Sequence, residues 1–184
     1  MPGADDDRGD ASDPEAEGRA LMADGAQRLV AGVHEGGRKW VEAVVVRVVD
    51  AWGALEEDAR AAALGAAATA GARAADRVEA ELQVLFELDP AQQRATPLEL
   101  IRSLRIEATE VLRSAGVPEV VRDEYETRAF PDDVYGIVLH TPAELGDEDL
   151  GGALLAWGLG KAKVLRARGG GAGGPGDGSR STHM

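Results

Sequence analysis

The sequence predicts an all-α fold: a helical bundle with one long central helix and disordered N- and C-terminal tails. Apolar side chains recur every three or four residues along most of the chain, as they do on one face of an α-helix. Alanine and glycine dominate the composition, and only seven residues are aromatic. Both ends of the chain are almost without apolar residues. We therefore expect closely packed helices between two unstructured ends.

The two ends differ from the central region in composition. Residues 1–18 contain seven acidic residues and one arginine, and seven of the sixteen residues 169–184 are glycine. Neither end has enough apolar surface to offset the conformational entropy lost on ordering. We assign residues 1–18 to a disordered acidic tail, 19–167 to the helical domain and 168–184 to a disordered Gly-rich tail.

Composition also excludes several classes of function. The formal net charge is −13, whereas nucleic-acid binding requires a cationic surface that releases phosphate counterions. Four cations near the C-terminus fit better as partners of a helix dipole: Lys161, Lys163, Arg166 and Arg168. The sequence has no cysteine, which excludes disulfides and thiolate chemistry. It also has no apolar run of about 18 residues that could cross a bilayer. We expect a cytoplasmic protein that binds no nucleic acid.

Two helices are expected in the first part of the domain, over residues 19–36 and 38–52. The pair Gly36-Gly37 interrupts the first apolar stripe. The run from Val41 to Trp52 is rich in β-branched residues, but its spacing of three and four favours a helix over a strand. Gly53 marks the turn that follows.

The longest helix is expected at residues 56–88, where a heptad pattern typical of a coiled coil extends from Leu64 to Leu85. The small residues at its centre, Gly71 among them, would let another helix approach closely. Two partners fit this seam: residues 38–52 of the same chain, packing back after Gly53, or the same helix of a second copy. The seam consists of Leu64, Ala68, Gly71, Ala75, Val78, Leu82 and Leu85.

Capping motifs predict the later helices. Thr96-Pro97-Leu98-Glu99 is a capping box with proline at the first helical position, and Gly116 supplies a left-handed residue after a helix over 97–115. The same T-P-x-E pattern at residues 141–144 either opens a short helical turn or leads directly into a helix over 147–167. That last helix is apolar around most of its circumference, so we expect it to be largely buried.

Residues 117–140 lack helical periodicity and combine charged with aromatic side chains. A long connection of this kind is usually functional or partly helical, and tyrosine and arginine are common anchors of protein interfaces. Within it, residues 137–139 are expected to lie against the core. We expect the segment to contact a protein partner through eight residues: Arg122, Asp123, Tyr125, Arg128, Phe130, Asp132, Asp133 and Tyr135.

Three stretches together resemble a known group of proteins. They are GVPEVVRDEY at residues 116–125, RAFPDDVY at 128–135 and AWGLGK at 156–161. The group is a family of uncharacterised proteins from high-GC actinobacteria, and the resemblance covers about residues 90–167. This family has no assigned activity, so the resemblance implies no catalytic residue.

Signatures of catalysis are scarce. Four residues could offer oxygen and imidazole ligands to a divalent metal: Asp132, Asp133, His140 and Glu144. However, no Glu-x-x-His or His-x-x-x-His pair fixes such ligands on one helical face, and neither a Gly-x-Ser-x-Gly elbow nor a Walker phosphate loop is present. We therefore expect no catalytic residue, no cofactor and no bound metal.

The preferred hypothesis is a non-enzymatic interaction or regulatory protein, acting on a protein partner or by self-association through the Leu64–Leu85 seam. The first alternative is an amphipathic protein whose residues 19–88 coat a lipid or hydrophobic granule surface. Its polar faces are acidic and mixed, whereas an anionic membrane favours lysine and arginine. The second alternative is a metal-dependent enzyme.

Overall fold

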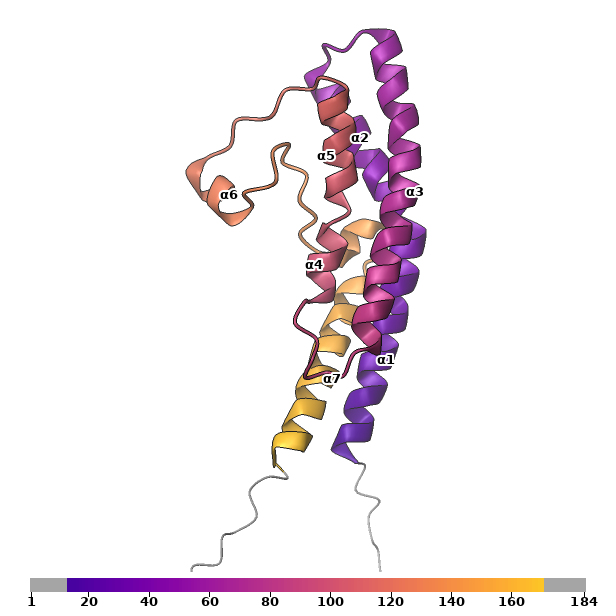
Figure 1. Cartoon of the computed structure of the whole chain (residues 1–184), viewed down its shortest axis with the longest axis vertical. Coiled ribbons are helices and arrows are strands. Elements are labelled where there is room, and N and C mark those ends of the chain that lie inside the picture. Colours follow the sequence, from indigo (N-terminus) through magenta and orange to yellow (C-terminus); the bar gives the residue numbers. More distant parts are fainter. Residues whose placement is uncertain (1–12, 171–184) are drawn as a thin grey trace, which may run out of the picture.

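The computed structural model describes residues 13–170, which form an elongated bundle of helices without any strand (Figure 1). The predicted all-α bundle with one long helix is therefore confirmed. Among the described residues, no helix combines the length and apolar character needed to cross a membrane. The elements in chain order are α1 (Pro14–Gly32), the π-helical turn η1 (Val33–Gly37), α2 (Arg38–Trp52), α3 (Glu57–Glu87), α4 (Pro97–Arg102), α5 (Arg105–Ser114), α6 (Glu124–Ala129), the 3₁₀-helix η2 (Pro142–Leu145) and α7 (Leu150–Gly170).

Both ends of the helical domain extend further than the sequence predicts. The first helix begins at Pro14 because Asp13 caps it, accepting a hydrogen bond of 3.0 Å from the backbone N–H of Glu15. At the other end, α7 continues to Gly170. Residues 14–18 and 168–170 thus belong to the bundle rather than to the tails. The predicted disorder of residues 1–12 and 171–184 lies outside the described residues.

The predicted break at Gly36-Gly37 is wrong. Helices α1 and α2 form one continuous helical run, and the two glycines lie in the π-helical turn η1 between them. A Cβ atom at Gly36 would lie 2.0 Å from the carbonyl oxygen of Leu145 in η2. The glycine is thus needed for a close contact between two elements and not for a turn.

The antiparallel contact between α1 and α7 joins the beginning and the end of the described chain (Figure 1). Three buried glycines face α7 at seven-residue intervals along α1: Gly18, Gly25 and Gly32. A Cβ atom at Gly25 would lie 2.5 Å from the carbonyl oxygen of Ala153 and 2.7 Å from the amide nitrogen of Trp157. From the other side, a Cβ atom at Gly160 would lie 2.5 Å from the carbonyl oxygen of Gly18. The two backbones can approach this closely only because no side chains separate them.

The heptad seam of α3 packs within the chain. After the turn at Gly53, whose φ is 66°, α2 and α3 lie side by side, as predicted for residues 38–52. A Cβ atom at Gly71 would lie 2.8 Å from the carbonyl oxygen of Arg38. The seam is buried from Gly71 onward, and a second copy could use this part only if the bundle opened.

The N-terminal half of α3 departs from the predicted register. Here Leu64 and Ala68 are only half-buried, and the buried positions lie one residue earlier in the sequence. An α-helix drifts by about 20° per heptad relative to a strict seven-residue repeat, so one fixed register does not stay on the buried face. The buried residues of α3 before Gly71 are Ala63, Ala67 and Ala70.

The capping box at Thr96 is confirmed, but the predicted helix over 97–115 is broken in two. The Thr96 hydroxyl accepts from the N–H of Glu99, whose carboxylate accepts from the N–H of Thr96. The break between α4 and α5 lies at Ser103, whose hydroxyl donates to the carbonyl of Leu100 at 2.6 Å. The Ser103 carbonyl accepts from the N–H of Ile106 at 3.0 Å and also from Arg77 of α3 at 3.1 Å. Such side-chain bonds compete with the helical ladder.

The last part of the chain shows one confirmed alternative and one wrong prediction. The second T-P-x-E motif forms its own short helix, η2, which ends at Gly146 with a φ of 97°. The expectation that the last helix is largely buried is wrong for its outer face, where Leu155 and Leu159 are 62% and 56% exposed. This face lacks a neighbour because α7 packs mainly on α1.

We predict that Gly25→Ala destabilises the protein whereas Gly158→Ala does not. Both positions lie inside helices, so both gain the same helix propensity, but a Cβ atom at Gly158 meets nothing within 4 Å. Overpacking at Gly25 should lower the free energy of unfolding by about 1–3 kcal/mol relative to Gly158→Ala. Urea unfolding followed by circular dichroism measures the difference. Equal stability of the two variants would contradict the close α1–α7 contact.

Candidate functional site

The segment expected to contact a partner projects from the bundle. Residues 118–135 leave the end of α5, and α6 lies at the outermost part of the excursion (Figure 1). None of the residues of α6 is buried. The segment is fastened near its base, because the N–H of Val120 donates to the carbonyl of Val134 at 3.0 Å.

Three of the eight predicted partner-binding residues lie exposed on α6 or at its start. The side chain of Tyr125 is 79% exposed. Arg128 forms an exposed ion pair of 2.6 Å with Glu124. The Asp123 carboxylate caps the helix by accepting from the N–H of Glu126 at 2.7 Å. All three side chains are therefore accessible to solvent, and their contact with a partner stays a prediction.

Two further residues shape the segment. The Arg122 guanidinium donates to the carbonyl of Phe130 at 2.6 Å, which closes the chain around α6. The half-buried Phe130 ring lies 5.8 Å from the guanidinium carbon of Arg102 and meets the His140 ring edge-on at 5.8 Å. Arg122 and Phe130 therefore hold the projecting turn in place, and little of either is left for a partner.

The remaining three residues lie where the segment rejoins the bundle. Asp132 is exposed and lies 3.6 Å from Arg105. Asp133 and Tyr135 are only 5% and 4% exposed, so their assignment to a partner-facing surface is wrong. The Asp133 carboxylate accepts from the N–H of Ile137 at 2.9 Å, and the Tyr135 hydroxyl donates to the carbonyl of Val117 at 2.8 Å.

Burial also raises the pKa of the Tyr135 hydroxyl above its ordinary value. Residues 137–139, which follow, are buried as predicted. The apolar run at residues 137–139 is the sequence signal that could have indicated the burial of the nearby Asp133 and Tyr135.

The residues considered for a metal site have other roles in the structure. Glu144 accepts from the N–H groups of His140 and Thr141 at 2.8 and 2.9 Å, and Asp133 caps Ile137 as described above. Over residues 13–170, no three histidine or carboxylate side chains gather in a way that could hold a metal ion.

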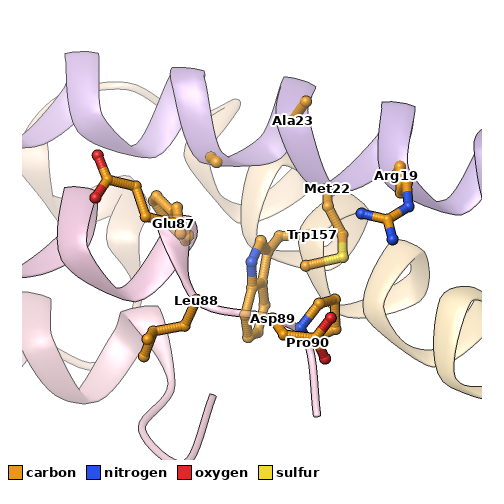
Figure 2. A pocket seen from close by; sticks show the side chains of 10 residues that line it. Arg19, Met22, Ala23, Glu87, Leu88, Asp89, Pro90 and Trp157 are labelled. Carbon is orange, nitrogen blue, oxygen red and sulfur yellow. The ribbon is translucent and has the colours of Figure 1, made fainter. Parts of the chain in front are cut away.

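A second candidate site lies where α1, α7 and the end of α3 with the residues that follow it surround a pocket of about 370 Å³ (Figure 2). The side chain of Trp157 forms one wall of the pocket, and the residue is only 5% exposed. The ring of Phe86 lies 6.2 Å away, centroid to centroid. The Lys161 ammonium lies 5.2 Å from the indole centroid and donates to the carbonyl of Gln93 at 2.8 Å.

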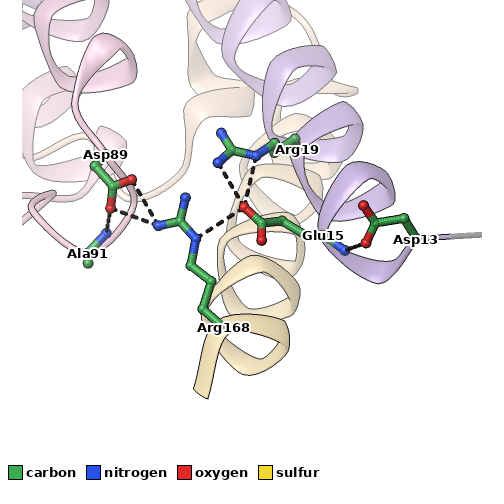
Figure 3. Close-up of polar contacts among 6 residues, drawn as sticks. All are labelled: Asp13, Glu15, Arg19, Asp89, Ala91 and Arg168. Carbon is green, nitrogen blue, oxygen red and sulfur yellow. Dashed lines mark hydrogen bonds and ion pairs between the residues drawn. The ribbon is translucent and has the colours of Figure 1, made fainter. Parts of the chain in front are cut away.

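An ion-pair network centred on Arg168 lies beside this pocket (Figure 3). The guanidinium of Arg168 contacts the Asp89 carboxylate at 2.8 Å and the Glu15 carboxylate at 3.1 Å. Arg19 contacts the same Glu15 at 2.8 Å, and the N–H of Ala91 donates to Asp89 at 3.0 Å. The network joins α1, α7 and the chain after α3.

The network changes the acid–base behaviour of both carboxylates. Hydrogen bonds from Arg19 and then Arg168 lower the pKa of Glu15 below its ordinary 4.5. The backbone N–H of Ala91 and then Arg168 lower the pKa of Asp89 below 3.8. The sequence did not predict this role, because Arg168 is interpreted there as a helix-dipole partner at the boundary of the tail, without a distant carboxylate to pair with.

We predict that Arg168→Gln weakens the acid dependence of stability. The pKa values of Glu15 and Asp89 are lower in the folded protein than in the unfolded chain, so their ionised forms stabilise the folded protein at a pH above their unfolded-state pKa values. This stabilisation is lost as the pH falls through the lowered pKa values and the carboxylates become protonated. The variant should be less stable at neutral pH, and its stability should fall less steeply below about pH 4.5.

Urea unfolding from neutral pH to about pH 3 tests this, with Arg166→Gln as the control. Arg166 is exposed on the same helix and its substitution removes the same charge. Parallel pH profiles for the Arg168→Gln variant and the native protein would contradict the assigned network.

Comparison with known proteins identifies no functional residue in this chain. No protein-family model, no curated protein and no solved structure matches this chain. The resemblance over residues 90–167 stays a prediction and supplies no functional residue.

Proposed function

We propose that this is a non-enzymatic interaction or regulatory protein of the cytoplasm, in which the helical bundle presents residues 118–130 to a protein partner. The observation that carries this proposal is the exposure of Val121 and Tyr125, fully and at 79%, on a segment fastened to the bundle. Single large apolar side chains are often exposed on protein surfaces, whereas groups of them mark interaction sites. Two of them on one fastened projection favour a surface that a partner covers.

The charge of the projection indicates what kind of partner fits. Its acidic residues exceed its arginines, and both arginines are engaged by groups of the segment itself. The whole chain carries a net charge of −13. We therefore propose a partner with an apolar pocket for Tyr125, surrounded by lysine or arginine. Complementary charge of this kind speeds association and makes it sensitive to salt.

The packing of the chain favours this function over the two alternatives. A lipid coat formed by residues 19–88 would need their apolar faces, but Leu29, Val33 and Val41 are completely buried in the bundle. A metal-dependent enzyme would need free ligands, whereas Asp133 and Glu144 are engaged with backbone N–H groups.

We predict that a photo-cross-linking residue placed at Tyr125 captures a protein partner in cells, whereas the same residue at Val46 does not. Val46 is the control because it is also exposed but lies on α2, in the body of the bundle. With the purified partner, Tyr125→Ala should weaken binding by about tenfold or more, as interface anchors do. Glu126→Ala, which removes an exposed carboxylate from the acidic projection, should also weaken it. Added salt should weaken it further.

Equal affinity of native protein and both variants, each with a native circular dichroism spectrum, would refute the assignment of this surface. Co-flotation of the intact protein with phospholipid vesicles, unaffected by either substitution, would favour the lipid-coating alternative instead.

A further inference from the structure

We infer that the pocket between α1, α7 and the end of α3 binds a compact, uncharged, largely apolar molecule that carries a hydrogen-bond acceptor such as a carbonyl oxygen. This site is separate from the projecting segment and does not depend on the function proposed for it. Three observations lead to the ligand class: the walls of the pocket, the state of the charges at its rim, and one unpaired donor.

Part of the wall suits an apolar molecule, while Arg19, Glu87 and Asp89 make the rest of it polar. The volume of about 370 Å³ lies within the range of small-molecule sites, roughly 300–1,000 Å³. Met22 of α1, Phe86 of α3, Pro90 and the indole of Trp157 surround it (Figure 2). Aromatic and thioether groups of this kind pack well against a small aromatic ring.

The charges at the rim give no reason for a charged ligand. Arg19 is engaged with Glu15, and Asp89 accepts from both Arg168 and the N–H of Ala91 (Figure 3). The third charged residue of the rim, Glu87, is exposed to water and would repel an anion. A charged ligand would have to break one of these pairs or remain close to a like charge.

The unpaired donor is the indole N–H of Trp157. Its nitrogen is buried and has no hydrogen-bond partner in the described part of the chain. Buried donors are nearly always paired, because an unpaired one loses its bond to water without replacement. The neighbouring Phe86 ring, tilted by 54°, offers at most a weak π acceptor.

The position of the donor fits a ligand acceptor. Figure 2 shows the nitrogen-bearing edge of the indole on the side of Glu87 and Leu88, facing away from Met22. The nitrogen has almost no accessible surface, so the inferred hydrogen bond requires the indole or Phe86 to move when the ligand enters. An uncharged molecule with one carbonyl group would then complete the hydrogen bonding of this wall.

Two probes of nearly equal size test the inference: acetophenone, which has a carbonyl oxygen, and ethylbenzene, which has none. The chain has three tryptophans, so a ¹H–¹⁵N spectrum contains three indole signals, which single Trp→Phe variants assign. Acetophenone should shift the Trp157 signal saturably and bind about tenfold more tightly than ethylbenzene, the usual contribution of one hydrogen bond.

In Trp157→Phe, acetophenone should bind no more tightly than ethylbenzene, while Trp52→Phe, which lies outside the pocket, should leave its affinity unchanged. The comparison of the two probes on native protein remains decisive if Trp157→Phe does not fold. Equal affinity for both probes, or a Trp157 signal that acetophenone does not shift or shifts only together with the other two, would overturn the inference.

Discussion

The close antiparallel contact of α1 with α7 is the constraint on which the other features of the structure depend. Helices usually pack with their axes about 8–10 Å apart because side chains lie between them. Here the glycines Gly18, Gly25 and Gly160 remove those side chains at the points of contact. The contact brings Trp157 against the first helix and Arg168 against Glu15. Both the pocket and the ion-pair network follow from it.

The bundle separates two surfaces with different chemistry. One is a mixed apolar and ionic pocket beside the contact of the first and last helices. The other is the acidic projection around α6, which buried anchors hold where it rejoins the core, Tyr135 foremost among them. Their separation means that a small molecule and a protein partner would not compete for the same residues. Each surface can therefore be altered without touching the other.

Local signals in the sequence predicted the local structure well. Residues close in sequence determine the Thr96 capping box, the turn at Gly53 and the long helix. Their spacing is therefore visible in the sequence. The α1–α7 contact could not be predicted in this way. A glycine inside a helix costs about 1 kcal/mol relative to alanine, so the local signal at Gly36 suggested a break, while its actual use is a contact with distant Leu145. The burial of Asp133 and Tyr135 likewise depends on contacts made when the chain rejoins the core, which the local pattern of residues 118–135 does not indicate.

Zero-length carbodiimide cross-linking tests the α1–α7 contact most directly. This reagent joins a lysine to a carboxylate only where the two form an ion pair, and the chain has only three lysines. Lys163 of α7 pairs with Glu17 of α1. In a mixture of ¹⁴N- and ¹⁵N-labelled protein, mass spectrometry should find the Glu17–Lys163 product within single chains. A Lys163 linked only to other carboxylates, or only between chains of different label, would contradict the pairing of the two ends.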